Sequence, residues 1–280
     1  MSTVYDSFER KHDYLVCVDS DGCAMDTMDI KHFRCFGPCM VAEWGLEQWK
    51  DEILERWNVI NLYSMTRGIN RFKGLAQALG EINEKYTPIE DISVLQAWVV
   101  SGAAPSNPAC KKAYEETGSI IMKKALAWSE AVNANIRLLP EEVKKPFEGA
   151  KEGLAAAHEV ADVAIVSSAN RDAVMEEWTK WKLLDSVDIV LAQDCGSKAE
   201  CIAEMLKFGY AQDHVLMVGD APGDRDAATK NGVYYYPIQV RKEKASWDEF
   251  VATGLGKLTS GEYADYETVK IREFLENLGG

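Results

Sequence analysis

One stretch of the chain says more about the architecture than any other: Val215-Leu-Met-Val-Gly-Asp-Ala-Pro-Gly-Asp-Arg-Asp226. Its first four residues are apolar, which is typical of a short strand that is buried on both faces. A glycine and an acidic turn follow, and the pattern from Asp224 to Lys230 is helical. Because a buried strand that leads through a turn into a helix is the repeating unit of parallel sheets, this stretch predicts an α/β fold.

Similar apolar runs occur on both sides of this stretch. They cover Tyr14–Val18, Val163–Val166, Asp188–Leu191 and Val233–Tyr236. From Val163 onward the runs alternate with helical patterns at Arg171–Trp181, Lys198–Phe208 and Asp224–Lys230. The sequence therefore predicts a doubly wound, Rossmann-like parallel sheet with helices between its strands. A last helix, with apolar residues at Tyr266, Val269, Leu275 and Leu278, is expected to pack on this sheet domain.

The stretch from Met25 to Leu139 differs, because its apolar spacing is helical and it contains no convincing strand. One stripe consists of Leu46, Trp49, Ile53, Trp57 and Ile60, and a second of Phe72, Leu75, Leu79, Ile82 and Tyr86. Two more helices are expected, one from the cap residue Asn107 to Gly118 and one that carries Ile121 to Val132. We expect an α/β core domain of residues 1–24 and 140–280, interrupted by an all-helical domain of residues 25–139.

The composition of the 280 residues is that of a globular protein. The chain is 47% hydrophobic and 27% charged with 8 prolines, which excludes disordered and fibrous proteins. No apolar run is long enough to span a membrane and no signal-peptide core is present, so we expect a cytoplasmic protein without a membrane partner. The excess of 45 acidic over 31 basic side chains, a net charge of −14, argues against nucleic acid as a partner. The seven cysteines include no CxxC pair and are expected to be reduced.

Polar clusters follow four of the five strand-like runs. They are Asp19-Ser-Asp-Gly22, Ser167-Ser-Ala-Asn170, Asp194-Cys-Gly-Ser-Lys198 and Gly219-Asp220 with Asp224. Each cluster alone has an ordinary explanation as a turn, a helix cap or a solvated charge. In parallel sheets, however, ligands bind beyond the carboxyl ends of the strands, so the four clusters would converge on one crevice. Asp220 and Asp224 there suit a hard cation that prefers oxygen ligands.

The order of these clusters resembles the motifs of the haloacid dehalogenase superfamily of phosphohydrolases. The resemblance covers about residues 14–28 and 146–237, and includes the extension of the first motif to Asp26-Thr27 and a last helix that ends at Gly232. The helical insert is similar in position and size to the family's helical cap, which lies between the first and second motifs. Two departures are Cys23, where threonine or valine is usual, and the absence of a proline after Lys198.

The resemblance implies four catalytic roles. Asp19 would attack phosphorus and form an aspartyl-phosphate, and Asp21 would act as general acid and then as general base. Ser167 would donate a hydrogen bond to a phosphoryl oxygen, and Lys198 would offset the negative charge around Asp19 and the phosphate.

The resemblance also implies a Mg²⁺ cofactor and a class of substrate. Asp19, Asp220 and Asp224 would hold the ion together with the backbone carbonyl of Asp21. Relatives that cleave carbon–halogen or carbon–phosphorus bonds have no aspartate at the position of Asp21, so its presence favours phosphate esters. The expected function is a Mg²⁺-dependent phosphatase for a small phosphorylated metabolite. The alternatives are a phosphomutase with the same core residues, or a non-catalytic module that receives a phosphoryl group like a response regulator.

Further residues are candidates for substrate binding. Near the core motifs these are Gly22, Ser168 and Asn170. Asn170 and Asp226 are also candidates for positioning the catalytic side chains from behind. In the insert, the cations Arg67, Arg71 and Lys73 could bind an oxyanion of the substrate, or could pair with neighbouring acidic surface. The sequence leaves the identity of the substrate, the oligomeric state and the role of the C-terminal segment open.

Overall fold

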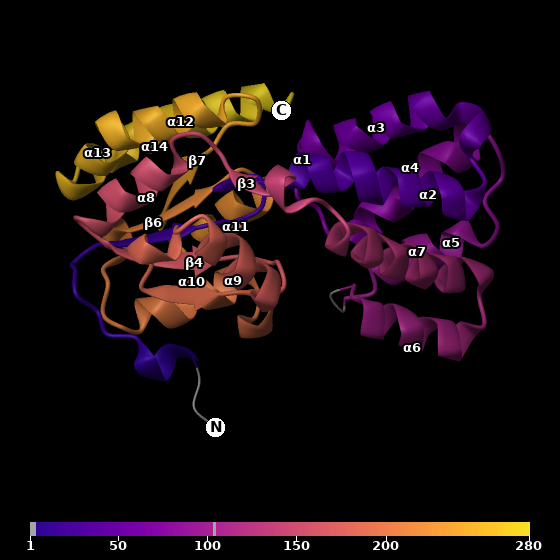
Figure 1. Cartoon of the computed structure of the whole chain (residues 1–280), viewed down its shortest axis with the longest axis horizontal. Helices are drawn as coiled ribbons and strands as arrows, with labels where there is room; N and C mark the ends of the chain where they lie inside the picture. Colours follow the sequence, from indigo (N-terminus) through magenta and orange to yellow (C-terminus); the bar gives the residue numbers. More distant parts are fainter. Residues whose placement is uncertain (1–3, 103–104) are drawn as a thin grey trace. The chain divides into compact units, whose positions relative to one another are not determined.

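The computed structural model of the chain describes residues 4–102 and 105–280, and these form two compact units (Figure 1). The first unit comprises Met1–Met28 and Glu141–Gly280 and is called the α/β unit below. The second comprises Asp29–Pro140 and is called the helical unit. No helix in the described part of the chain is both long and apolar enough to cross a membrane. All seven cysteines are free thiols.

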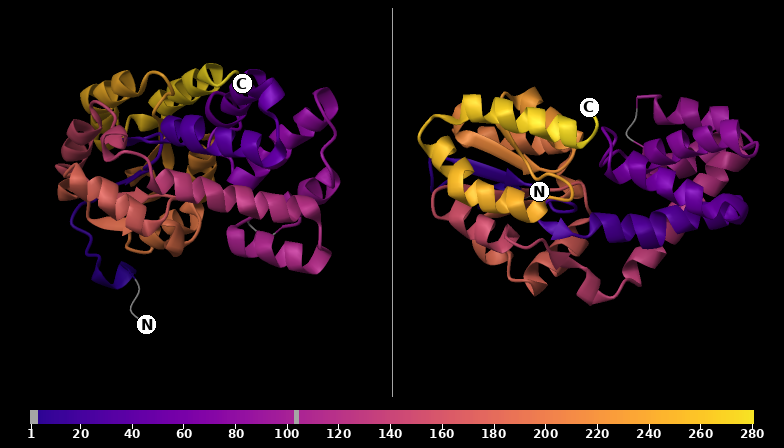
Figure 2. Two further views of the ribbon diagram at one scale, coloured as in Figure 1. Left: turned by 45° about the vertical axis from the view of Figure 1, so that its right-hand side comes forward. Right: turned by 90° about the horizontal axis from the view of Figure 1, so that it is seen from above.

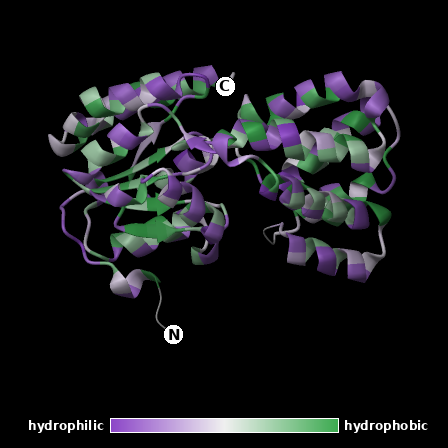
Figure 3. Cartoon of the chain, viewed as in Figure 1, coloured by the Kyte–Doolittle hydropathy of each residue, from purple (hydrophilic) through white to green (hydrophobic). Residues whose placement is uncertain are grey.

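The α/β unit is built on a five-stranded parallel sheet with the order β5-β4-β1-β6-β7. The strands are β1 (Leu15–Val18), β4 (Asp162–Val166), β5 (Ile189–Leu191), β6 (Val215–Gly219) and β7 (Tyr234–Pro237). Val18 of β1 is paired with Ile165 on one side and with Val218 on the other, so β1 occupies the centre of the sheet. The prediction of a parallel α/β sheet is confirmed, and the strands are among the most hydrophobic segments in Figure 3.

Helices cover the sheet and supply its core. They are α8 (Ala150–His158), α9 (Arg171–Lys180), α10 (Lys198–Leu206), α11 (Pro222–Asn231), α12 (Glu243–Glu249), α13 (Leu255–Thr259) and α14 (Tyr263–Asn277), with a π-helical turn at Phe250–Gly254. Val16 and Ile165 share one buried cluster with Leu154 of α8, Trp178 of α9 and Trp247 of α12. Helices α10 and α11 contact β4 and β6.

The C-terminal helix packs on the sheet as expected. The ring of Phe274 in α14 meets the ring of Tyr235 in β7 edge to face at 5.6 Å between centroids. In both views of Figure 2 the yellow helices of this segment lie beside the orange strands. Val269, which the sequence pattern placed on the apolar face, is 39% exposed and does not belong to it.

A small feature of the α/β unit departs from the sequence analysis. Strand β2 (Met25–Asp26) pairs antiparallel with β3 (Lys145–Pro146), although the stretch from residue 25 was expected to contain no strand. Two residues are too few to show the alternation that identifies a strand in a sequence. Short 3₁₀ turns complete the unit at Val4–Ser7, Glu141–Val143, Leu184–Ser186, Gln193–Cys195 and Gln212–His214.

The helical unit contains the four helices that the sequence predicts and additional short ones. The predicted helices are α3 (Lys50–Leu62), α4 (Arg71–Lys85), α6 (Asn107–Thr117) and α7 (Ile120–Arg137). The additional elements are α1 (Met28–Lys31), a π-helical turn (His32–Phe36), α2 (Gly37–Trp44), a 3₁₀ turn (Glu47–Trp49) and α5 (Ile92–Val99). The cap of α6 is Ser106 rather than Asn107, because the Ser106 hydroxyl accepts the Ala109 N–H. Trp57, Phe72 and Trp128 are fully buried at the centre of the unit.

Two arginines at the start of α4, Arg67 before the helix and Arg71 as its first residue, are engaged inside this unit. The side chain of Arg67 is 1% exposed, donates to the carbonyl of Leu62 at 2.8 Å and lies 3.9 Å from a carboxylate oxygen of Asp29. Arg71 donates to the Asn133 amide oxygen at 2.7 Å and to the Ser129 hydroxyl at 3.0 Å. Burial lowers the pKa of Arg71. Both guanidinium groups therefore join segments of the helical unit.

We predict that Arg67→Ala destabilises the helical unit by about 2 kcal/mol, because it removes charged hydrogen bonds from a buried position. Lys73→Ala is the matched control, since Lys73 belongs to the same segment but is exposed, and it should leave stability nearly unchanged. Thermal unfolding followed by circular dichroism measures both effects. Equal melting temperatures for the two variants would contradict the structural role of Arg67.

Candidate active site

The centre of the site is Asp19, the first residue after the central strand β1. Its N–H donates to the carbonyl of Val218 at 3.0 Å, which continues the β1–β6 pairing by one residue. The side chain lies at the carboxyl edge of the sheet and the residue is only 6% exposed. Three backbone hydrogen bonds close the turn that follows. Ser20 O accepts the N–H of Met25 at 2.8 Å and that of Cys23 at 3.3 Å, and Met25 O accepts the N–H of Gly22 at 2.9 Å. This Asp19–Met25 loop places Asp19 and Asp21 on one short, tightly bonded segment.

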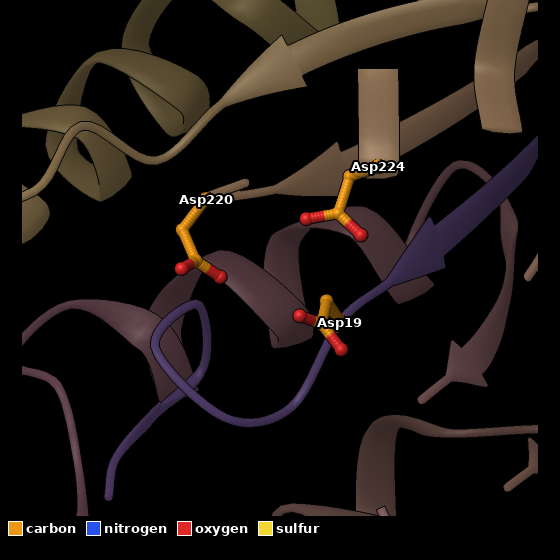
Figure 4. Close-up of side chains that lie close together, drawn as sticks. All are labelled: Asp19, Asp220 and Asp224. Carbon is orange, nitrogen blue, oxygen red and sulfur yellow. The ribbon is translucent and has the colours of Figure 1, made fainter. Parts of the chain in front are cut away.

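Two further carboxylates meet Asp19 from the neighbouring strand. Asp220 follows β6 and Asp224 lies in the first turn of α11, and oxygen atoms of the three side chains lie within 4.8 Å of one another (Figure 4). Asp224 also accepts the N–H of Ala221 at 3.0 Å, so it caps α11 and belongs to the cluster at once. Gly219 permits this approach, because a Cβ atom there would lie 2.4 Å from the Asp224 carboxylate.

Lys198 balances part of this negative charge. It is the first residue of α10, whose N-terminus is fixed by a reciprocal pair of bonds between Ser197 and Glu200. Its ammonium lies 2.8 Å from an Asp19 oxygen and donates to Asp224 as well. Burial lowers the pKa of Lys198, but the charges of Asp19 and Asp224 raise it by more. The net pKa of Lys198 is therefore above its usual value, and the group stays charged. Lys198 thus joins the first and last motifs.

The electrostatics of Asp19 follow from this crowding. Burial raises the pKa of Asp19 above its usual value, Lys198 lowers it, and Asp224 and Asp220 raise it again, with a net shift upward. The ionised carboxylate is therefore costly in the protein alone. Three buried carboxylates against one ammonium leave an excess of negative charge, and all their ligand atoms are oxygens. This donor set fits a hard divalent cation.

Asp21 is not a member of the cluster of three carboxylates. Its Oδ1 accepts a hydrogen bond of 2.5 Å from the hydroxyl of Thr27, six residues along the chain. Gly22, the next residue, adopts φ of 86°, a conformation that favours glycine and allows the sharp turn. The side chain of Asp21 therefore has a fixed partner without belonging to the carboxylate cluster.

The second polar cluster starts at the end of β4, beside β1. Ser167 is 4% exposed, its N–H donates to Leu191 O at 2.9 Å, and its hydroxyl accepts the Ala169 N–H at 3.1 Å. Asn170 caps α9 by accepting the Asp172 N–H at 3.0 Å, which is the ordinary explanation of this residue. Ser168 and Asp226 are exposed. Substrate contacts of Gly22, Ser168, Asn170, Arg67, Arg71 and Lys73 stay predictions.

The structure adds one residue to the site that the sequence analysis identified only as part of a predicted helix. Trp178 of α9 is fully buried, and its indole Nε1–H donates to the hydroxyl of Ser20 at 2.9 Å. Ser20 lies between Asp19 and Asp21, so this bond fixes the loop that carries both. A buried tryptophan in an amphipathic helix carries no sequence signal for such a partner, because the two residues are 158 positions apart.

Comparison with known proteins agrees with the motifs and the fold. A family model of haloacid dehalogenase-like hydrolases matches residues 104–237. No curated protein matches the sequence. Among solved structures, a proposed phosphoglycolate phosphatase from Lactobacillus delbrueckii subsp. bulgaricus has a TM-score of 0.50 and 15% identity, over 80% of this chain and 85% of that one.

Two other solved structures are less similar. A haloacid dehalogenase-like hydrolase from Streptococcus pneumoniae has a TM-score of 0.45 and 11% identity, over 84% of this chain and 90% of that one. A proposed beta-phosphoglucomutase from Thermotoga maritima has a TM-score of 0.43 and 15% identity, over 80% and 84%. At 15% identity the likeness to the Lactobacillus structure concerns the fold alone, and the likeness to the family rests on the matched residues 104–237. Residues 104–237 of this chain therefore match a family of haloacid dehalogenase-like hydrolases.

Proposed function

We propose that the protein is a Mg²⁺-dependent phosphatase that hydrolyses a small phosphorylated metabolite through an aspartyl-phosphate. The observation that carries this proposal is the position of Asp19. Asp19 is buried just after the carboxyl end of the central strand. Its carboxylate is 2.8 Å from the Lys198 ammonium, and it belongs to a cluster with Asp220 and Asp224. A carboxylate in such a place can attack phosphorus when nearby positive charge offsets that of the phosphoryl oxygens.

In the first half of the reaction, an Asp19 oxygen forms a bond to phosphorus while the bond from phosphorus to the ester oxygen breaks. The leaving alkoxide takes a proton from Asp21, which therefore enters the reaction protonated. The Thr27 hydroxyl, 2.5 Å from Asp21 Oδ1, holds this carboxyl group in one orientation. Ser167 and Lys198 are assigned to the phosphoryl oxygens, Ser167 as a hydrogen-bond donor and Lys198 as a positive charge.

In the second half, water attacks the phosphorus of the aspartyl-phosphate and Asp21 takes one of its protons. Inorganic phosphate leaves and Asp19 is restored as a free carboxylate, so the proton that Asp21 gave is returned. Asp19, Asp220 and Asp224 are the side chains that would hold Mg²⁺, and the ion would supply further positive charge at the phosphoryl group.

Asp21 favours phosphate esters over organic halides. An alkoxide leaving group needs a proton donor, whereas a departing halide does not. The helical unit is inserted between Asp21 and Ser167, which is the sequence position of the family's cap, and we assign substrate selection to it. A phosphomutase would use the same core residues and differs in passing the phosphoryl group to a second hydroxyl rather than to water.

Asp19→Asn should abolish phosphate release from a panel of phosphorylated metabolites, with a loss on the order of 10³-fold or more, because the amide cannot act as nucleophile. Asp213→Asn changes an exposed aspartate of the same unit and should leave turnover unchanged. Release of inorganic phosphate in the presence of Mg²⁺ is the measurement. Turnover by Asp19→Asn near the wild-type rate would rule out the covalent mechanism.

The same substitution should raise stability in metal-free buffer. The pKa of Asp19 is raised on folding, so ionised Asp19 costs stability at neutral pH, and the cost is relieved as the pH falls through the folded pKa. Asp19→Asn should therefore melt at a higher temperature than the wild type at pH 7. The difference should shrink towards pH 4. A lower melting temperature at pH 7 would mean that the pair with Lys198 outweighs the repulsion.

Metal binding can be tested without a substrate. Mg²⁺ at about ten times its dissociation constant should stabilise the wild type by about 1.4 kcal/mol, because it binds the folded protein only. Asp220→Asn should lose most of this stabilisation, and Asp213→Asn should keep it. Thermal unfolding with Mg²⁺ and with EDTA gives both values. A Mg²⁺-induced shift that survives in Asp220→Asn would exclude the proposed ligand set.

A further inference from the structure

The segment after residue 237 lies beyond the part of the chain that matches the family, yet one of its side chains reaches the candidate site. This segment forms α12, the π-helical turn, α13 and α14. Trp247 of α12 is fully buried, and its indole Nε1–H donates to the backbone carbonyl of Cys23 at 3.1 Å. Cys23 is 224 positions earlier in the chain and belongs to the Asp19–Met25 loop.

The indole of Trp247 is held in one position by its surroundings. A Cβ atom at Gly153 of α8 would lie 2.3 Å from the six-membered ring, so the ring rests directly on the backbone of that helix. On another side the ring of Phe250 meets Trp247 edge to face, at 5.6 Å and 87°. At Gly149, whose φ is 89°, a Cβ atom would lie 3.0 Å from the Trp247 Cβ. A side chain packed this closely has little freedom to turn its N–H away from Cys23.

The Asp19–Met25 loop is thus fixed by two indole groups that come from different helices. Trp178 of α9 holds Ser20 on one side of Asp21, and Trp247 of α12 holds Cys23 on the other. An indole N–H can only donate, and both acceptors are buried, so neither bond has a replacement partner in water when it is lost. The loop between the two anchors contains the proposed general acid.

We propose that Trp247 is a positioning residue of the active site, supplied by the C-terminal segment. It acts through the Cys23 carbonyl on the orientation of Asp21, and this role rests on the proposed function of the Asp19–Met25 loop. Because proton transfer to the leaving oxygen depends on the placement of Asp21, loss of the anchor lowers the rate of the chemical step. Binding of the phosphoryl group, which is assigned to other residues, is unaffected.

The test compares Trp247→Phe with Trp128→Phe. Both tryptophans are fully buried and both donate Nε1–H to a backbone carbonyl at 3.1 Å, but the acceptor of Trp128 is Phe36 in the helical unit. The two variants should lose similar thermal stability. Only Trp247→Phe should speed hydrogen exchange of the Gly22 and Met25 amides, by about tenfold or more. It should also lower kcat for an alkyl phosphate, whose alkoxide leaving group needs the proton from Asp21, by roughly ten- to a hundredfold and keep KM within about twofold.

Hydrogen exchange separates this proposal from the proposed function. If the wild type hydrolyses no phosphate ester, the proposed function fails, while the exchange of Gly22 and Met25 still shows whether Trp247 fixes the loop. If Trp247→Phe leaves loop exchange and kcat at the values of Trp128→Phe, Trp247 only fills the core and the proposal is wrong. Should Trp247→Phe not fold, Gly153→Ala displaces the indole without removing it and must change loop exchange in the same direction.

Discussion

The ammonium group of Lys198 between two buried aspartates is the interaction on which the site depends. Asp19 comes from the end of β1 and Asp224 from the first turn of α11, and without a cation between them their carboxylates would repel at close range. Lys198 reduces this repulsion but cannot cancel three carboxylates. The fold therefore maintains an excess of buried negative charge that a bound cation would offset, and this is the physical basis of the proposed metal-assisted chemistry.

The same residues serve the architecture and the site. Asp224 caps α11 through the Ala221 N–H while it contacts Lys198, and Lys198 is itself the first residue of α10. Gly219 ends β6 without a side chain, which lets the Asp224 carboxylate approach. The first turns of α10 and α11 therefore carry the charged side chains of the site, and the contact between these side chains also holds the two helix ends together. For this reason a capping role and a site role at Asp224 are not alternatives, although the sequence offers them as two separate readings.

Much of this arrangement follows from local sequence. The five strands and the four motif clusters are contiguous patterns, and the carboxyl edge of a parallel sheet necessarily brings the clusters together. The anchors of the Asp19–Met25 loop could not be predicted in this way. Trp178 and Trp247 look like ordinary core residues, and their partners Ser20 and Cys23 lie 158 and 224 positions away. Arg67 also could not be predicted from its position. A charged residue in a loop is expected to be exposed, but the Arg67 side chain is almost completely buried and donates to the Leu62 carbonyl.

These long-range anchors explain how a loop with acidic side chains keeps its shape. Asp19 and Asp21 belong to a turn closed by three backbone bonds, and a turn of this length would not hold two carboxylates in fixed directions by itself. The indole groups add hydrogen bonds that approach from α9 and α12, helices that also contribute to the hydrophobic core. The position of the loop therefore depends on the packing of the core, because an indole can shift only if its neighbours move too. Substitutions in the C-terminal segment act on the candidate chemistry through this path, although none of its described residues belongs to the carboxylate cluster.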